Sequence, residues 1–216
     1  MIYKFTEVLN DLRDCFLLGD ILLLEQWKNT NGLSDDLASE FTSNVSGDNV
    51  ALEGIMHFMT GIVNYPYTII FNLSGDKPEL LKEGNRLQVR QGGYSLKVEN
   101  NVLLLFTWPI LTRFSNENIS ALIESYKNQQ NTSPHALISG GLHSLPYIEI
   151  ENGWYSIEIL GGETLQSHEV KNVKTGEMVQ VSNFDPTFEF VLKKTEKQVV
   201  EKFDIDFSFK ISSSTY

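Results

Sequence analysis

The segment IEIENGWYSIEI, residues 148–159, combines two runs of alternating residues around a central Asn-Gly pair. Apolar side chains alternate with polar ones on both sides of Asn152 and Gly153, which is the pattern of strands with one buried face. Asn-Gly favours the positive φ angles of a tight turn. The segment therefore predicts a β-hairpin, and a fold in which strands dominate.

A second segment, LQVRQGGYSLKV at residues 87–98, shows the same pattern 61 residues earlier, at 87 against 148. Gln91 and Gly92 stand where the first segment has Asn-Gly, so this segment predicts a second hairpin. Internal duplication and chance similarity between β-strands both account for the match. The prediction of two hairpins is the same in either case.

Further segments are typical of strands. KFDIDFSFKIS (202–212) alternates apolar and polar residues without exception, which makes it the clearest strand in the chain. VLLLFTW (102–108) is apolar throughout, as expected of a strand covered on both faces. TFEFVLK (187–193) is also predicted to be a strand, and Thr175-Gly176 is predicted to form a hairpin turn.

Helical spacing is confined to a few places. Ser115 is a suitable N-cap for a helix over about 116–128, whose apolar residues form one stripe: Ile119, Leu122, Ile123 and Tyr126. A similar stripe, which includes Cys15, predicts a helix over about 6–17. The segment 49–62 has apolar spacing that suits either a helix or a strand, and its glycines favour the strand.

These patterns predict an α+β fold that is mainly β, built as an antiparallel sandwich or barrel of hairpins with one or two helices. A chain of 216 residues, 41% hydrophobic, is long enough to bury one sizeable core. We therefore expect a single domain over 1–216. The polar segment QQNTSP, 129–134, is the best candidate for a junction between two lobes, 1–128 and 135–212.

The chain is acidic, with 28 Asp and Glu against 17 Lys and Arg and a net charge of −11. Residues 1–60 hold ten of the acidic residues and three basic ones, and residues 149–169 hold five glutamates with no Lys or Arg. Such a field repels phosphate backbones and anionic lipid, so we expect no direct binding to nucleic acid or membranes. The acidic field either attracts a basic protein or serves solubility alone.

The single cysteine, Cys15, excludes an internal disulfide, so the fold has no need of an oxidising compartment. The first residues lack the basic and apolar pattern of a secretory signal, and no apolar run approaches the ~20 residues of a membrane span. We therefore expect a soluble, cytoplasmic protein.

No catalytic motif is present, and no cofactor is predicted. A phosphate-binding loop needs glycines that lead from a strand into a helix, whereas the Gly-Gly pairs are expected to lead into extended or loop segments: 92–93, 140–141 and 161–162. Cys15 is expected to be a buried thiol rather than a nucleophile, since no histidine precedes His57. A site built from His135, His143 and His168, holding a metal ion or a small molecule, is the main alternative.

Taken together, the chain resembles the small, acidic, cysteine-poor immunity proteins of bacterial polymorphic-toxin systems. This resemblance concerns composition and implies a non-enzymatic protein that neutralises a basic toxin, such as a nuclease. Trp154 is a candidate contact, because Tyr155 keeps the register of the buried residues and so leaves Trp154 on the other face. The predicted partner-binding residues are Asp35, Asp36, Glu40, Asp48, Glu149, Glu151, Trp154 and Glu163. A small-molecule- or metal-binding β-barrel protein or enzyme, and a structural module of a larger assembly, are the alternatives.

Overall fold

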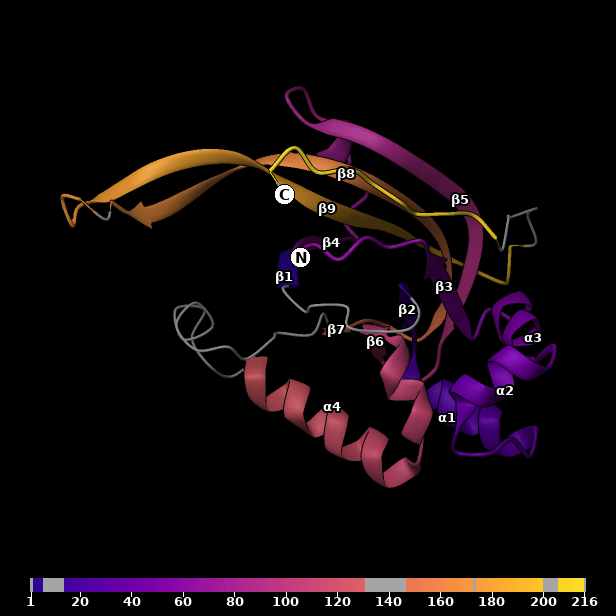
Figure 1. The fold of residues 1–216 in the computed structure, drawn as a ribbon. Coiled ribbons are helices and arrows are strands. Elements are labelled where there is room, and N and C mark those ends of the chain that lie inside the picture. The colour runs from indigo at the N-terminus through magenta and orange to yellow at the C-terminus, as the bar shows by residue number, and fades with distance from the viewer. Residues whose placement is uncertain (1, 6–13, 131–146, 173, 200–205, 216) are drawn as a thin grey trace.

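The computed structural model describes residues 2–5, 14–130, 147–172, 174–199 and 206–215. Two β-sheets stack face to face, and helices cover the far side of one of them (Figure 1). The fold is therefore α+β and mainly β, and it is a sandwich, one of the two predicted architectures.

The large sheet has the strand order β1-β4-β9-β8-β5. Neighbouring strands are antiparallel except β4 and β9, which run parallel, so the sheet is mixed where the sequence predicted hairpins throughout. Strands that meet in parallel cannot be joined by a tight turn, and this pair comes from distant parts of the chain. The bounds are β1 Ile2–Phe5, β4 Tyr67–Asn72, β5 Arg86–Val98, β8 Gly153–Lys171 and β9 Met178–Thr195.

The small sheet has the order β3-β2-β6-β7 and is antiparallel. Its strands are β2 Cys15–Gly19, β3 Met56–Thr60, β6 Val102–Thr107 and β7 Tyr147–Glu149. Every residue of β6 is buried, because one face of this strand meets the large sheet and the other meets helices. The predicted strand with two covered faces is confirmed.

Four α-helices lie against the small sheet: α1 Ile21–Thr30, α2 Leu37–Ser43, α3 Ser46–Leu52 and α4 Asn116–Gln130. Two short 3₁₀ helices are η1 Glu79–Leu81 and η2 Trp108–Arg113. The predicted helix near 116–128 is confirmed, with the amide of Asn118 3.3 Å from the Ser115 hydroxyl and Ile119 and Ile123 buried. Among the described helices, none is both long and apolar enough to cross a membrane.

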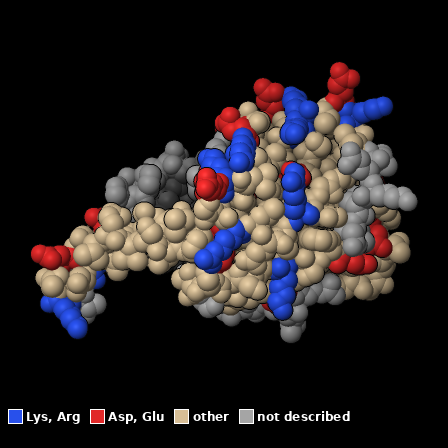
Figure 2. All heavy atoms as spheres, turned by 90° about the horizontal axis from the view of Figure 1, so that it is seen from above, with Lys and Arg blue, Asp and Glu red and all other residues tan. Residues whose placement is uncertain are grey.

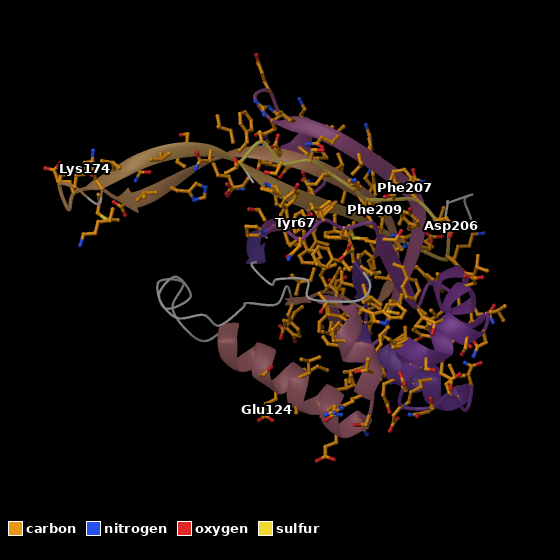
Figure 3. All side chains as sticks on the ribbon, in the orientation of Figure 1. Tyr67, Glu124, Lys174, Asp206, Phe207 and Phe209 are labelled. Atoms are coloured by element: carbon orange, nitrogen blue, oxygen red, sulfur yellow. The ribbon has the colours of Figure 1, made fainter. Side chains whose placement is uncertain are left out.

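The core has two layers. Between the sheets, rings and branched side chains of both inner faces interdigitate, and Figure 3 shows Tyr67 and Phe209 in this crowded space. Behind the small sheet, Leu17 and Phe106 pack against the helices, including Ile119 of α4. Burial of both faces of the small sheet explains why β2 and β6 are short continuous apolar runs rather than alternating ones.

The two predicted hairpins are wrong, although the strands are there. Residues on either side of Asn152 belong to different sheets, since β7 pairs with β6 and β8 pairs with β5 and β9. Gly153, at φ 145°, lies where the chain crosses between the layers. At Gln91-Gly92 the chain does not turn back: β5 continues through a β-bulge before Tyr94. Alternation reports one buried face, and it does not identify the sheet to which that face belongs.

The Gly161-Gly162 pair lies inside β8 and does not lead into a loop, as the sequence had predicted that it would. A Cβ atom on Gly162 would lie 2.0 Å from the carbonyl oxygen of Arg86, and one on Gly161 would lie 2.6 Å from Val89 and from Phe188. The glycines therefore allow close packing around β8 between β5 and β9.

The C-terminal segment follows its predicted alternation without joining a sheet as a strand. Residues 202–205 lie outside the described part of the chain, and 206–215 make a single bridge, between Ser208 and Thr60. Phe209 and Ile211 are nevertheless buried between the sheets, while Ser208 and Lys210 are exposed. The segment fills the core from its edge.

Two predictions near the N-terminus also change. Cys15 and Phe16 belong to strand β2, so the helix predicted over 6–17 is wrong at its end, and residues 6–13 lie outside the described chain. Short apolar runs fit either structure, and burial on both faces decided for the strand. The ambiguous segment 49–62 is divided: α3 ends at Leu52 and β3 begins at Met56, with Gly54 at φ 68° between them.

Strands β8 and β9 extend past the large sheet as a two-stranded arm, formed by residues 164–171 and 178–186 (Figure 1). The predicted turn at Thr175-Gly176 is confirmed, with Gly176 at φ 76°. Strands from both sides of residues 129–134 share each sheet, because β7 pairs with β6 while β8 and β9 lie between β4 and β5.

Candidate functional site

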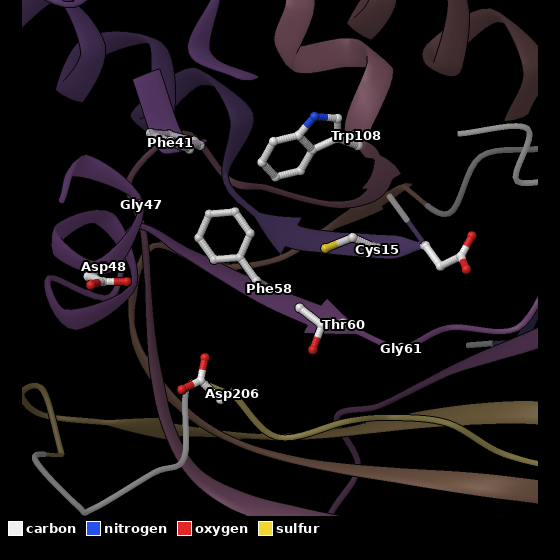
Figure 4. A pocket seen from close by; sticks show the side chains of 10 residues that line it. Cys15, Phe41, Gly47, Asp48, Phe58, Thr60, Gly61, Trp108 and Asp206 are labelled. Carbon is white, nitrogen blue, oxygen red and sulfur yellow. The ribbon is translucent and has the colours of Figure 1, made fainter. Parts of the chain in front are cut away.

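A pocket of about 490 Å³ opens on the helix-covered side of the small sheet, at a place that the helices leave uncovered (Figure 4). Its lining comes from six parts of the chain: the start of β2, the helices α2 and α3, strand β3, η2 and the C-terminal segment. The lining residues are Asp14, Cys15, Phe41, Gly47, Asp48, Phe58, Thr60, Gly61, Trp108 and Asp206. We call this feature the aromatic pocket.

Three half-buried aromatic rings form the apolar part of the pocket. Phe41 and Phe58 meet edge to face, with ring centroids 5.7 Å apart and planes at 87°. Phe58 and Trp108 lie 6.4 Å apart with planes at 45°. The rings therefore face the pocket at different inclinations, and the buried Cys15 adds apolar surface on the neighbouring strand.

Three exposed carboxylates stand around these rings. Asp14 precedes β2, Asp48 lies in the first turn of α3, and Asp206 belongs to the C-terminal segment. In Figure 4 the carboxylate of Asp206 lies on the side of Phe58 and Thr60 away from Trp108. No lysine or arginine lines the pocket among the described residues. A cation that entered would meet attractive charges and, among the described lining residues, no repulsive one.

The charge around the pocket follows from the sequence of the helical segment. Between residues 29 and 60 the chain has five acidic residues and no Lys or Arg. Lys28 precedes this segment, and its buried ammonium group is bound to Asp35 and to the carbonyl oxygen of Phe114, 2.8 Å away. That cation is therefore occupied in holding α1 to the η2 region.

Hydrogen bonds fix helix α2 in place. The Asp36 carboxylate caps α2 by accepting from the amide of Ser39 at 3.0 Å. The Glu40 carboxylate accepts from the amide of Ser34 and from the side chain of Asn44, and the bond to Ser34 is the main reason why the pKa of Glu40 is lowered. These bonds hold the helix that carries Phe41 into the pocket wall.

The predicted partner-binding residues divide into two groups. Asp35, Asp36, Glu40 and Asp48 belong to one stretch of the chain around α2 and α3, and only Asp48 lines the pocket. The first three are engaged within the chain, as ion pair, helix cap and loop anchor. Asp48 is therefore the member of this group whose carboxylate points to ligand binding.

The remaining predicted residues lie elsewhere. Glu149 is an exposed residue of β7, and Glu151 is paired with Lys194. Trp154 is half-buried on the outer face of the large sheet, against Gly54, with the ammonium of Lys97 5.8 Å from its ring. These residues do not line the pocket, so they form no common site with Asp48 there.

Glu163 is a correction to the predicted acidic surface, because it is only 3% exposed. Its carboxylate accepts from the amide and hydroxyl of Ser214 at 2.6 and 2.7 Å and lies 3.2 Å from the Arg86 guanidinium. Burial opposes the charge of Glu163, but these bonds outweigh it, and the pKa is lowered. Glu163 holds the C-terminal segment against the large sheet.

The outer face of the large sheet differs from the pocket region. Figure 2 shows basic and acidic side chains interspersed across this face, and an arm that carries charge mainly at its tip. Several of the basic residues are paired with glutamates: Lys82–Glu79, Arg90–Glu158, Lys97–Glu99 and Lys194–Glu151. Paired charges cancel at a distance, so they contribute less field than the exposed carboxylate of Asp48 in α3.

The histidine site is not assembled in the described structure. His135 and His143 lie outside the described residues, and His168 is on the arm, with Nε2 2.8 Å from a carboxylate oxygen of Asp185. Within the described ranges, no group of three or more His, Cys, Asp and Glu side chains is arranged to hold a metal ion. The metal alternative stays a prediction.

Sequence reasoning missed the aromatic rings of the pocket. Phe41, Phe58 and Trp108 come from three separate elements, and no spacing along the chain connects them. Phe41 and Phe58 do lie in the stretch without Lys or Arg, but that feature predicts an acidic surface and gives no indication of a pocket.

Comparison with protein-family models, curated proteins and solved structures finds no match to the chain.

Proposed function

We propose that this chain is a non-enzymatic interaction protein that binds a basic protein through the surface around the aromatic pocket. An immunity protein that neutralises a basic toxin acts in this way. The observation that carries the proposal is an apolar hollow that bears carboxylates and no basic residue among its described lining. Complementary charge accelerates the encounter, and partly buried aromatic surface supplies affinity once contact is made.

Further surface features of the helical segment support the same face. Val45 and Leu52, at the ends of α3, are 67% and 59% exposed. Exposed apolar side chains beside a hollow are common at protein interfaces, where an apolar centre is surrounded by a polar rim. Helix α3 would thus present Asp48 between two apolar contacts.

The experiment begins with a partner. Tagged protein is used to capture basic proteins from the native host, and the association rate constant is then measured for the purified partner over a series of salt concentrations. For the double variant Asp14→Lys/Asp48→Lys we expect association at low salt to be about tenfold slower or more, with a flatter salt dependence. Both carboxylates are exposed, so neither substitution places a lysine in the core.

The control is Asp76→Lys, which changes one exposed carboxylate in the connection after β4, away from the pocket lining. The slowing caused by this one reversed charge should be less than half of the slowing per reversed charge in Asp14→Lys/Asp48→Lys. Equal association rates for wild type and the double variant would contradict the proposal. Asp35, Asp36 and Glu40 are unsuitable for this test because each is bonded within the chain.

A further inference from the structure

We infer that the aromatic pocket is a binding site for an alkylammonium group, and that its occupant is a lysine side chain of the basic partner. This inference rests on the proposed function for the source of the lysine. The pocket itself and its chemistry are independent of that source. The inference goes further than general charge attraction, because it assigns one type of cationic group to one place.

The arrangement of the rings selects the shape of the cation. A cation is attracted to the face of an aromatic ring, and several rings around one space form a cage for a rounded ammonium group. A guanidinium is planar and binds best when it lies flat on one ring or forks onto one carboxylate. With planes at 87° and 45°, a planar group that lies flat on one ring cannot also lie flat on the next. A rounded ammonium group can approach the pocket-facing surface of more than one of these rings, since all three belong to the lining.

The size and lining of the pocket suit the aliphatic stem of lysine. A volume of about 490 Å³ exceeds the needs of a bare ion and accepts a flexible side chain together with part of its flanking backbone. Phe58 and Cys15 supply apolar surface for the methylene groups. Lysine side chains commonly bury their stems along apolar surface while the charged end reaches polar groups.

The carboxylates and Thr60 supply acceptors at the rim. Asp14 and Asp48 stand on different elements beside the rings, so an ammonium with three donors can find an acceptor in more than one direction. In Figure 4 the hydroxyl of Thr60 lies on the same side of Phe58 as Asp206. A neutral ligand would gain the apolar contact but none of this charge interaction.

The experiment uses small probes and nuclear magnetic resonance of the whole chain. Butylammonium reproduces the end of a lysine side chain, propylguanidinium reproduces that of arginine, and 1-pentanol is a neutral probe one carbon longer than butylammonium. We expect butylammonium to shift the indole signal of Trp108 and the amide signals of Gly47 and Thr60, with a Kd on the order of 1–10 mM. The indole signal of Trp154, outside the pocket, is the internal reference.

Propylguanidinium and 1-pentanol should each bind at least fivefold more weakly than butylammonium. Phe58→Leu keeps an apolar wall and removes a ring, so it should weaken butylammonium at least threefold and 1-pentanol less than twofold. Asp48→Asn removes one charge at an exposed position. It should weaken the binding of butylammonium and leave the binding of 1-pentanol unchanged. This second variant keeps the test decisive if Phe58→Leu disturbs the small sheet.

The final arm concerns the partner. Butylammonium chloride should weaken partner binding more than the same concentration of sodium chloride, because it competes for the pocket as well as screening charge. The inference would be overturned if 1-pentanol bound as tightly as butylammonium, or if butylammonium did not shift the Trp108 signal. The association kinetics of Asp14→Lys/Asp48→Lys would still test the proposed function separately. Binding of butylammonium without any competition would overturn the assignment to a partner lysine. Loss of competition in Phe58→Leu, with partner association retained, would support it.

Discussion

Acid should destabilise this protein through His57, a histidine buried in the space between the sheets. His57 lies on β3 opposite Leu18, and its ring is 3.8 Å from that of Tyr94 and 5.9 Å from that of Phe209. Its Nε2 atom is buried and makes no hydrogen bond within the described residues. Burial lowers the pKa of His57 to about 3, from 6.5 in an exposed chain. The folded protein therefore holds His57 in its neutral form down to strongly acidic pH.

The direction and size of the effect follow from proton linkage. Below pH 6.5 the unfolded chain binds a proton at His57 that the folded chain does not bind, so the free energy of unfolding falls as the pH falls. The loss is about 1.4 kcal/mol for each pH unit between 6.5 and about 3. At pH 4.5 this single residue should cost about 3 kcal/mol relative to pH 8.

Urea denaturation of wild type and His57→Leu at pH 8, 6.5, 5.5 and 4.5 measures this cost. Carboxylates titrate over the same range, but they titrate in both proteins, so the difference between the two curves isolates His57. Relative to the difference at pH 8, we expect the free energy of unfolding of His57→Leu to rise against that of wild type by about 1 kcal/mol at pH 5.5 and about 3 kcal/mol at pH 4.5. Met59→Leu, a neighbouring core substitution without a titratable group, should stay parallel to wild type. Parallel curves for His57→Leu would refute the reasoning.

Two further predictions concern the stability of the fold. Asp20→Ala should lower the free energy of unfolding by about 3 kcal/mol in a urea titration. The buried Asp20 carboxylate caps α1 by accepting from the amides of Leu22 and Leu23, and it also accepts from the amides of Glu99 and Asn100. Asp36→Ala loses one exposed cap bond and should cost about 1 kcal/mol in the same titration. Gly162→Ala should cost more than about 3 kcal/mol, since its Cβ would overlap the Arg86 carbonyl oxygen. Gly92→Ala, where the nearest atom is 3.8 Å away, should cost less than about 1 kcal/mol, and equal thermal shifts for the two glycine variants would contradict the packing argument.

The sequence predicted burial better than it predicted pairing. Alternation correctly indicated that Tyr155 and Phe209 face the core, and the apolar run at 102–107 correctly indicated a strand covered on both faces. These outcomes depend on which side of a strand meets water, and this is local information. Strand partners are set by packing between distant segments. The sequence therefore gave no sign that β7 and β8 separate into two sheets at Asn152, or that β4 meets β9 in parallel.

The turns show the same division between local and distant causes. Thr175-Gly176 turns the chain at the end of the arm, where β8 and β9 pair only with each other among the described strands. Gln91-Gly92 has similar turn chemistry, yet β5 runs on, because pairing with β8 on both sides of the bulge outweighs the local preference. Glycine at such a position relieves a bulge as readily as it makes a turn. Local signals are therefore reliable at the end of the arm and unreliable inside the sheet.

For the candidate site, the acidic character could be predicted from the sequence, whereas the location of the pocket could not. Asp48 could be proposed from its acidic neighbourhood, but so could Glu163, and only burial separates an accessible carboxylate from one that anchors a segment. The rings of Phe58 and Trp108 have no signal of their own, because aromatic residues in a β-rich chain are ordinarily core. They become a candidate binding surface only because α2 and α3 stop short of covering this end of the small sheet. The ends of the helices therefore determine which carboxylates lie beside the half-buried aromatic rings. The acidity of a sequence segment does not determine this.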